Sequence, residues 1–212
     1  MKSFADPGAL PPERHRTALL DIEAIVIGAS AGGVDALAIL FEGLPAGFRP
    51  SILVVVHIPP DRPSRLAELY RQRCPLDVRE ALDKERVAGG TIYFAAPDYH
   101  LLVEPDRTLS LSSDAPVAFS RPSIDVLFES AAFAYREKLL GIVLSGANSD
   151  GAQGLATIRA AGGHAWVQDP EDALADAMPA AAIANAGADL VLPVRDMAER
   201  LAQLRSGRAV AI

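Results

Sequence analysis

Three side chains that can carry out acyl-transfer chemistry follow three apolar runs of the sequence: Ser30, His57 and Asp150. Each run is short and rich in β-branched residues, which is typical of a buried parallel strand. In an open α/β sheet the functional site lies beyond the carboxyl ends of the strands, and neighbouring strands are only about 4.8 Å apart. The three side chains are therefore expected to meet at one edge of the sheet.

A serine needs a base within hydrogen-bond reach, and that base needs a carboxylate to orient it. We expect Ser30 to be the nucleophile, His57 the general base and then acid, and Asp150 the group that holds the imidazole. Residues 28–32 match the G-x-S-x-G turn that exposes a nucleophilic serine. Backbone N–H groups near Ser30 and around Ala147 are expected to form an oxyanion hole.

Taken singly, each of these residues also has an ordinary structural interpretation. Ser30 and Asp150 can be helix N-caps, and His57 can be a histidine in a surface turn. Their joint position at three strand ends favours the triad. The chain order Ser, His, Asp differs from the Ser, acid, His order of the α/β-hydrolases. His100 and His164 are expected to have structural or surface roles.

Composition excludes several classes of protein. Half of the 212 residues are hydrophobic, enough for a substantial core, and the formal net charge is -7 with no Lys/Arg run. A nucleic-acid binder would need a basic face. The single cysteine, Cys74, excludes an internal disulfide and a cysteine-based metal cluster. No apolar run approaches the roughly 20 residues of a membrane span, and no signal peptide is present, so we expect a cytoplasmic protein without membrane insertion.

The alternation of strand and helix signals predicts a doubly wound, mostly parallel sheet flanked by helices. Strands are expected at about 22–27, 51–56, 139–144, 164–167 and 188–192. Short strands separated by turn residues between 87 and 111 predict an inserted antiparallel hairpin or meander. Residues 1–20 are rich in proline and are expected to be a disordered leader, so that residues 21–212 form one domain.

Beyond these patterns, the sequence resembles the catalytic domain of the CheB-type protein-glutamate methylesterases from residue 22 onward. The matching segments are Ile25–Leu37 (IVIGASAGGVDAL), His57–Pro60 (HIPP), Tyr93–Pro97 (YFAAP) with His100-Leu101, Arg121–Phe128 (RPSIDVLF), Leu144–Ala152 (LSGANSDGA), Gln168–Pro170 (QDP) and Met178-Pro179. Several ordered segments are far more specific than the serine turn alone.

The resemblance implies hydrolysis of glutamate γ-methyl esters on the cytoplasmic helices of chemoreceptors, with release of methanol, and often deamidation of receptor glutamines. It assigns the nucleophile, base and orienting acid to Ser30, His57 and Asp150. It implies a site without metal or cofactor. A separate response regulator or kinase is a further expected partner.

The sequence departs from the family pattern at several positions. Where the family usually has Gly-Met-Gly, this chain has Gly146, Ala147 and Asn148, and Ala31 follows the nucleophile where threonine is common. The backbone or side chains of Ala31, Gly32, Ala147 and Asn148 remain candidates for oxyanion and substrate binding. The family usually carries an N-terminal receiver domain, which needs on the order of 100 residues. The leader is about 20 residues long, so phosphorylation control in cis is expected to be absent unless the chain is a fragment.

Two other functional classes compete with the hydrolase. A non-catalytic adaptor that keeps the fold is the main alternative, and an esterase that acts outside chemotaxis is a variant. A dinucleotide-binding oxidoreductase is disfavoured because the glycines do not fit G-x-G-x-x-G.

Arg62, with Arg65 and Arg121, is expected to flank the cleft and steer an acidic receptor surface, or else to be an ordinary solvated arginine.

Overall fold

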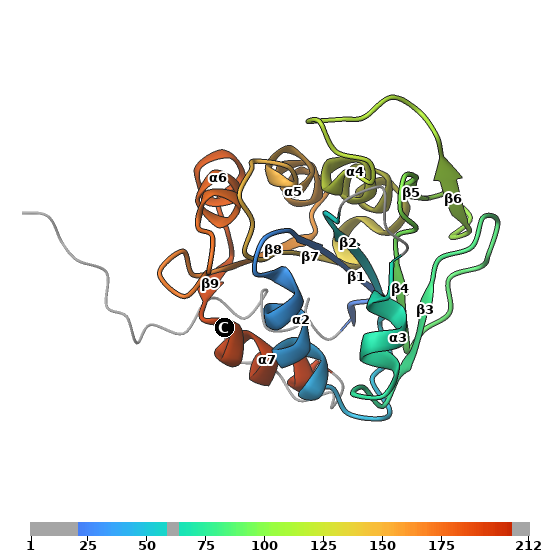
Figure 1. Ribbon diagram of the computed structural model, residues 1–212, viewed down its shortest axis with the longest axis horizontal. Helices are drawn as coiled ribbons and strands as arrows, with labels where there is room; N and C mark the ends of the chain where they lie inside the picture. The colour runs from blue at the N-terminus through green and yellow to red at the C-terminus, as the bar shows by residue number, and fades with distance from the viewer. Residues whose placement is uncertain (1–20, 59–63, 205–212) are drawn as a thin grey trace, which may run out of the picture.

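A seven-stranded parallel sheet forms the centre of the computed structural model, which describes residues 21–58 and 64–204 (Figure 1). Its strand order is β3-β4-β2-β1-β7-β8-β9. The strands are β1 (Ala24–Ala29), β2 (Ser51–Val56), β3 (Asp77–Glu80), β4 (Thr91–Phe94), β7 (Leu139–Val143), β8 (His164–Gln168) and β9 (Leu190–Leu192). Because β1 pairs with β2 on one side and β7 on the other, the strand order reverses at β1. That reversal is the usual place for a ligand site in an open α/β sheet.

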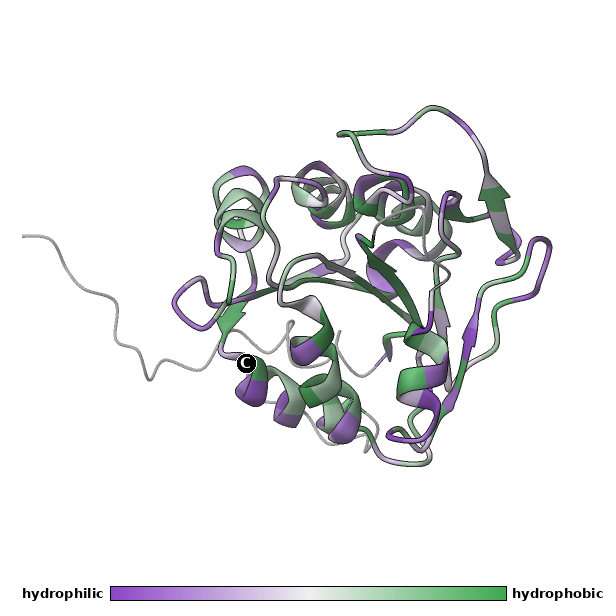
Figure 2. Ribbon diagram, viewed as in Figure 1, coloured by the Kyte–Doolittle hydropathy of each residue, from purple (hydrophilic) through white to green (hydrophobic). Residues whose placement is uncertain are grey.

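Two layers of helices cover the sheet (Figure 1). One face carries α2 (Gly33–Glu42), α3 (Leu66–Arg71) and α7 (Val194–Gln203), and the other carries α4 (Ile124–Tyr135), α5 (Ala152–Ala160) and α6 (Ala177–Ala186). The fold predicted from the sequence, a doubly wound α/β sheet between helices, is confirmed. Green, apolar ribbon fills the sheet in Figure 2, whereas purple residues lie on the outer faces of the helices.

Each face of the sheet has its own hydrophobic core. Side chains alternate along a strand, so Ile25 and Ile27 of β1 enter the core under α2, while Val26 enters the core under α4. All six residues of β1 and of β2 are buried. Burial on both faces explains why these strands are continuous apolar runs in the sequence.

The region between 87 and 111 contains the predicted antiparallel insertion, in the form of a hairpin. Only β5 (His100–Val103) and β6 (Leu109–Ser112) form an antiparallel hairpin. The preceding strand, β4, pairs parallel with β2 and β3 inside the main sheet. The edge strand β3 was not predicted, because its sequence, Asp-Val-Arg-Glu, is mostly charged.

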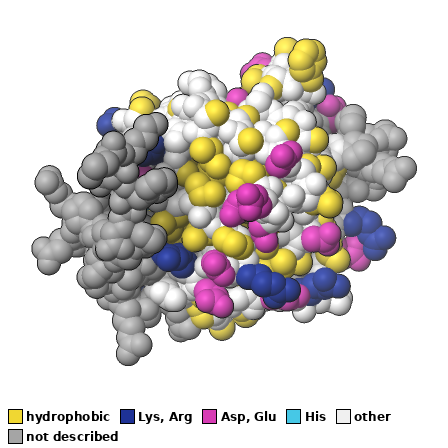
Figure 3. All heavy atoms as spheres, turned by 90° about the vertical axis from the view of Figure 1, so that its left-hand side faces the viewer, with side chains coloured by type: hydrophobic (Ala, Val, Ile, Leu, Met, Phe, Trp, Pro, Cys, Tyr) yellow, Lys and Arg dark blue, Asp and Glu magenta, His cyan; other side chains and the backbone are white. Residues whose placement is uncertain are grey.

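The surface carries dispersed charge. On the face shown in Figure 3, acidic side chains lie across the middle and basic ones toward the margin.

Of the helices in the described part of the chain, none combines the length and the apolar character that crossing a membrane requires. The predicted leader, residues 1–20, lies outside the described residues.

Candidate active site

Three turns converge beyond the carboxyl ends of the central strands β2, β1 and β7. Ser30 follows β1 and His57 follows β2, and the His57 N–H donates to the Ala29 carbonyl at 3.1 Å. The Ser30 N–H donates to the carbonyl of Ser145, in the turn after β7, at 2.9 Å. Backbone hydrogen bonds therefore hold the three predicted turns together at the point where the strand order reverses.

His57 and Asp150 form a direct pair. His57 Nε2 lies 2.8 Å from Asp150 Oδ2, and the Asp150 side chain is fully buried while that of His57 is slightly exposed. The Ser30 side chain is partly exposed, and its Oγ makes no hydrogen bond to another residue of 21–58 or 64–204. The geometry thus joins the predicted base to its predicted orienting acid. The hydroxyl of the predicted nucleophile, Ser30, is not bound by any other described residue.

The N-terminus of α4 holds the Asp150 carboxylate. Asp150 Oδ1 accepts from Ser123 Oγ at 2.9 Å and from the Asp125 N–H at 3.0 Å, and Oδ2 accepts from the Ile124 N–H at 2.8 Å. Burial alone would raise the pKa of Asp150, but the hydrogen bonds from His57, Asp125 and Ile124 outweigh it and hold the pKa below its usual value. The carboxylate is therefore kept ionised, as an acceptor for His57 requires.

Capping around this carboxylate differs from the local pattern in the sequence. Asp150 caps α4, which precedes it in the chain, and not α5, whose N-cap is Gly151 in the left-handed region. Ser123 occupies the N-cap position of α4, yet its hydroxyl donates to Asp150 and makes no capping bond of its own. The Asp150 side chain thus caps α4 in place of Ser123, although serine is a common N-cap residue.

Close packing of Ile124 sets the distance between α4 and the strand ends. A β-carbon at Gly28 would overlap Ile124 Cγ2, and one at Gly151 would lie 2.7 Å from the same atom. Real β-carbons essentially never approach so closely. The two glycines therefore let Ile124 approach until its own N–H reaches Asp150.

Two further residues, His100 and Ser145, support the site through contacts with distant segments. His100 is buried, and its Nδ1 accepts the Ser123 N–H at 3.1 Å. Ser145 Oγ donates to the Ala31 carbonyl at 2.7 Å and accepts the Ala175 N–H at 2.9 Å. The prediction of a structural role for His100 agrees with this contact. No local pattern in the sequence indicates either partner.

The candidate oxyanion donors lie around Ser30. The N–H groups of Ala31, Gly32 and Ala147 make no hydrogen bond within the described chain, and Gly32 has φ 80° at the start of α2. Asn148 presents its side chain to His57, with Nδ2 3.4 Å from Nδ1. Their roles in substrate binding stay predictions. Arg62 lies outside the described residues.

A cavity of about 370 Å³ opens beside His57. Its wall includes Phe119, which is fully exposed, and Arg121. The Arg121 guanidinium is bound by Asp98 at 2.6 Å and by two backbone carbonyls, and Arg65 pairs with Glu68. These contacts favour a structural role for Arg121 over the steering role.

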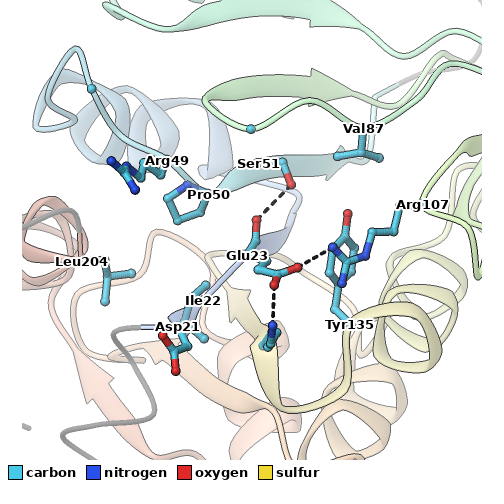
Figure 4. Close-up of a pocket in the computed structure, with 13 residues that line it drawn as sticks. Asp21, Ile22, Glu23, Arg49, Pro50, Ser51, Val87, Arg107, Tyr135 and Leu204 are labelled. Atoms are coloured by element: carbon cyan, nitrogen blue, oxygen red, sulfur yellow. Dashed lines mark hydrogen bonds and ion pairs between the residues drawn. The ribbon is translucent and has the colours of Figure 1, made fainter. Parts of the chain in front are cut away.

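A larger cavity, of about 880 Å³, lies at the opposite edge of the sheet (Figure 4). It is polar, and Glu23 at its centre binds Lys138 and Arg107. Glu23 immediately precedes β1, so this cavity lies at the amino ends of the strands, away from the site. Among the residues that the structure describes, no cluster of three or more His, Cys, Asp or Glu side chains is placed to hold a metal ion.

Together, the reversal of strand order at β1 and the gathering of Ser30, His57 and Asp150 define a doubly wound α/β protein with a hydrolase-type constellation. The chain matches the CheB methylesterase family over residues 25–201, and it belongs to that family. Its predicted resemblance to this family is confirmed.

Comparisons with individual proteins agree. A relative from Leptospira interrogans, provisionally named a protein-glutamate methylesterase/protein-glutamine glutaminase, is 45% identical over 87% of this chain and 96% of its own length. A protein of that name from Trichodesmium erythraeum is 38% identical over 86% of this chain and 53% of its own length. The crystal structure of the Thermotoga maritima CheB methylesterase catalytic domain superposes with a TM-score of 0.82 at 32% identity, covering 86% of this chain and 98% of that one.

Proposed function

We propose that this protein is a serine hydrolase that removes the methyl group from glutamate γ-methyl esters of methyl-accepting chemoreceptor proteins, and that it also deamidates receptor glutamines. Membership of the CheB methylesterase family and the names of its relatives support this activity. The observation that carries the proposal is the 2.8 Å contact between His57 and the buried Asp150, beside Ser30 at the end of β1.

The reaction follows from the arrangement of these side chains. The ionised Asp150 accepts a hydrogen bond from His57 Nε2–H, which leaves Nδ1 with the lone pair. The Ser30 hydroxyl adds to the ester carbonyl carbon as its proton passes to Nδ1. The same proton then goes to the departing methoxide, so that methanol leaves and an acyl-enzyme forms. Water, deprotonated by His57, hydrolyses that acyl-enzyme to the free glutamate.

The negative charge that develops on the carbonyl oxygen needs donors. The N–H groups of Ala31, Gly32 and Ala147, which make no hydrogen bond within the described residues, are the candidates. A backbone N–H is present whatever the side chain of its residue. The replacement of the family's methionine by Ala147 therefore preserves the donor. A preorganised donor of this kind contributes about 3–4 kcal/mol in related reactions.

The substrate we propose is the cytoplasmic helical region of a methylated receptor, and a cytoplasmic location, a separate response regulator or a kinase stay predictions. The adaptor alternative is not favoured, since a chain that works by binding alone has no need of an aspartate buried behind a histidine. The reaction as written uses only residues of this chain, with no step through a metal or a cofactor.

Methanol release from a methylated receptor fragment tests the proposal. We expect Ser30→Ala to lower the rate by on the order of 10⁴-fold or more, as loss of a serine nucleophile does elsewhere. Ser149→Ala is the matched control, because Ser149 is an exposed serine in the neighbouring turn and should retain the wild-type rate. Equal rates for Ser30→Ala and wild type would contradict the hydrolase function.

A further inference from the structure

The side chain of Asn148 contacts the histidine on the side opposite to the aspartate. Asn148 Nδ2 lies 3.4 Å from His57 Nδ1, while Asn148 Oδ1 accepts the Asp150 N–H at 3.2 Å. The second contact fixes the orientation of the amide, because only the amide oxygen can accept a hydrogen bond from a backbone N–H. The Nδ2 group, a donor, must therefore be the atom that faces His57.

The state of the imidazole follows from its other contact. Asp150 is ionised and accepts from Nε2–H, so Nδ1 of the neutral ring carries the lone pair. A donor of Asn148 thus meets an acceptor of His57. At 3.4 Å the hydrogen bond is long and correspondingly weak. A weak bond is what an exchangeable contact requires.

We propose that Asn148 is a positioning residue that occupies the proton-accepting nitrogen of His57 in the resting protein, so that the Ser30 hydroxyl must displace it for reaction. The catalytic role of Asn148 rests on the proposed function, whereas its contact with His57 does not depend on that function. At the position of Asn148 the methylesterase family usually has glycine, which has no side chain. In this chain the Asn148 side chain therefore contacts Nδ1 of His57, a contact that a glycine at this position does not make.

The charged groups around His57 are not themselves replaced when Asn148 is changed. Asp150 bonds the ring directly, and Asp98 and Arg121 form an ion pair on the wall of the adjoining cavity. Asp125 lies behind Asp150 on α4. A change in the titration of His57 on substitution of Asn148 is thus attributable to the lost amide, which contacts Nδ1 of the ring and also accepts the Asp150 N–H.

The sign of the expected effect is defined. A donor to Nδ1 stabilises the neutral imidazole, so removing it favours the protonated ring. Asn148→Ala should move the midpoint of the His57 titration up by about half a pH unit, which is roughly threefold in the ionisation equilibrium. Asn148→Asp keeps the acceptor for the Asp150 N–H and places a carboxylate near Nδ1, so it should raise the midpoint by about one unit or more.

The test is an NMR titration of the ¹⁵N-labelled imidazoles in the full chain, which needs no substrate and is independent of the methanol assay. The chain has four histidines, and a His57→Gln variant assigns the signal. Asn185→Ala is the matched control, since the Asn185 amide donates to the Ala152 carbonyl and not to a histidine. Asn148→Gly replaces the alanine variant if that variant does not fold.

An upward shift in Asn148→Ala with none in Asn185→Ala supports the proposal. An unchanged or lowered midpoint in Asn148→Ala, or an unmoved midpoint in Asn148→Asp, overturns it. As a second readout, a fluorophosphonate probe should label Ser30 roughly threefold faster in Asn148→Ala than in wild type at a pH above both midpoints. Slower labelling in that variant would refute the competition between Asn148 and Ser30.

Discussion

Removing the Ser123 hydroxyl tests how the acid of the site is held. Ser123 is fully buried and donates to Asp150 Oδ1 at 2.9 Å, so Ser123→Ala deletes one charge-assisted hydrogen bond with almost no change in volume. Oδ1 then keeps only the Asp125 N–H. Hydrogen bonds to charged groups contribute about 1.5–3 kcal/mol, so we expect the free energy of unfolding at pH 7 to fall by about 2 kcal/mol.

The loss should depend on pH in a defined direction. The folded state lowers the pKa of Asp150, so the stability that this carboxylate contributes is present above its unfolded pKa and is lost as the pH falls through the folded one. Ser123→Ala raises the folded pKa toward the unfolded value. The difference in stability between wild type and variant should therefore be largest near pH 7 and shrink below about pH 5, as both proteins bind the proton.

Urea denaturation at a series of pH values measures this difference, and Ser130→Ala provides the control. Ser130 lies on the same helix, α4, and its hydroxyl donates to backbone carbonyls and accepts the Val103 N–H, so its partners are uncharged. The decrease in the free energy of unfolding caused by Ser130→Ala should therefore be nearly independent of pH. A Ser123→Ala cost that is equally flat from pH 7 downward, or below about 0.5 kcal/mol throughout, would refute the charge-based account of Asp150.

Two further predictions concern packing and substrate contact. Gly28→Ala should destabilise the protein by about 1–3 kcal/mol, because the new β-carbon overlaps Ile124. Ile124→Ala alone should cost about 2–5 kcal/mol, and the double variant should lose less stability than the sum of the two single losses. Additive losses in thermal unfolding would contradict the contact. Phe119→Ser should raise KM for a receptor fragment by roughly threefold to tenfold with kcat unchanged, because this exposed ring lies beside His57 and its burial by substrate is worth about 1 kcal/mol. Phe133→Ser, at an exposed position of α4, should leave KM unaltered, and an equal KM for both variants would show that Phe119 does not bind substrate.

Much of the central sheet was predictable from sequence, and so was the approach of His57 to Asp150. Strands buried on both faces must be apolar throughout, which makes β1, β2 and β7 visible as continuous runs. A polar residue directly after such a run is then placed by topology alone at the carboxyl edge of the sheet. This reasoning needs no knowledge of which helix packs where.

The remaining features depend on contacts between distant segments. The edge strand β3 is charged because it faces solvent, so it has no apolar signature. β4 resembles part of a meander because turn residues flank it, and only its pairing with β2 separates it from the hairpin. The cap that Asp150 provides to α4 and the support from His100 and Ser145 join residues more than 20 positions apart, beyond the reach of local patterns.

The convergence of the central strands has a consequence for how the protein acquires its chemistry during folding. His57 and Asp150 are 93 positions apart in sequence, and they meet only when the β2, β1 and β7 strands are in register. Contacts of such separation incur loop-closure entropy before they contribute stability, so they form slowly. The reactivity of Ser30 would therefore develop at a late stage of folding, and its labelling by a serine-directed probe after dilution from urea would report the completion of the parallel sheet.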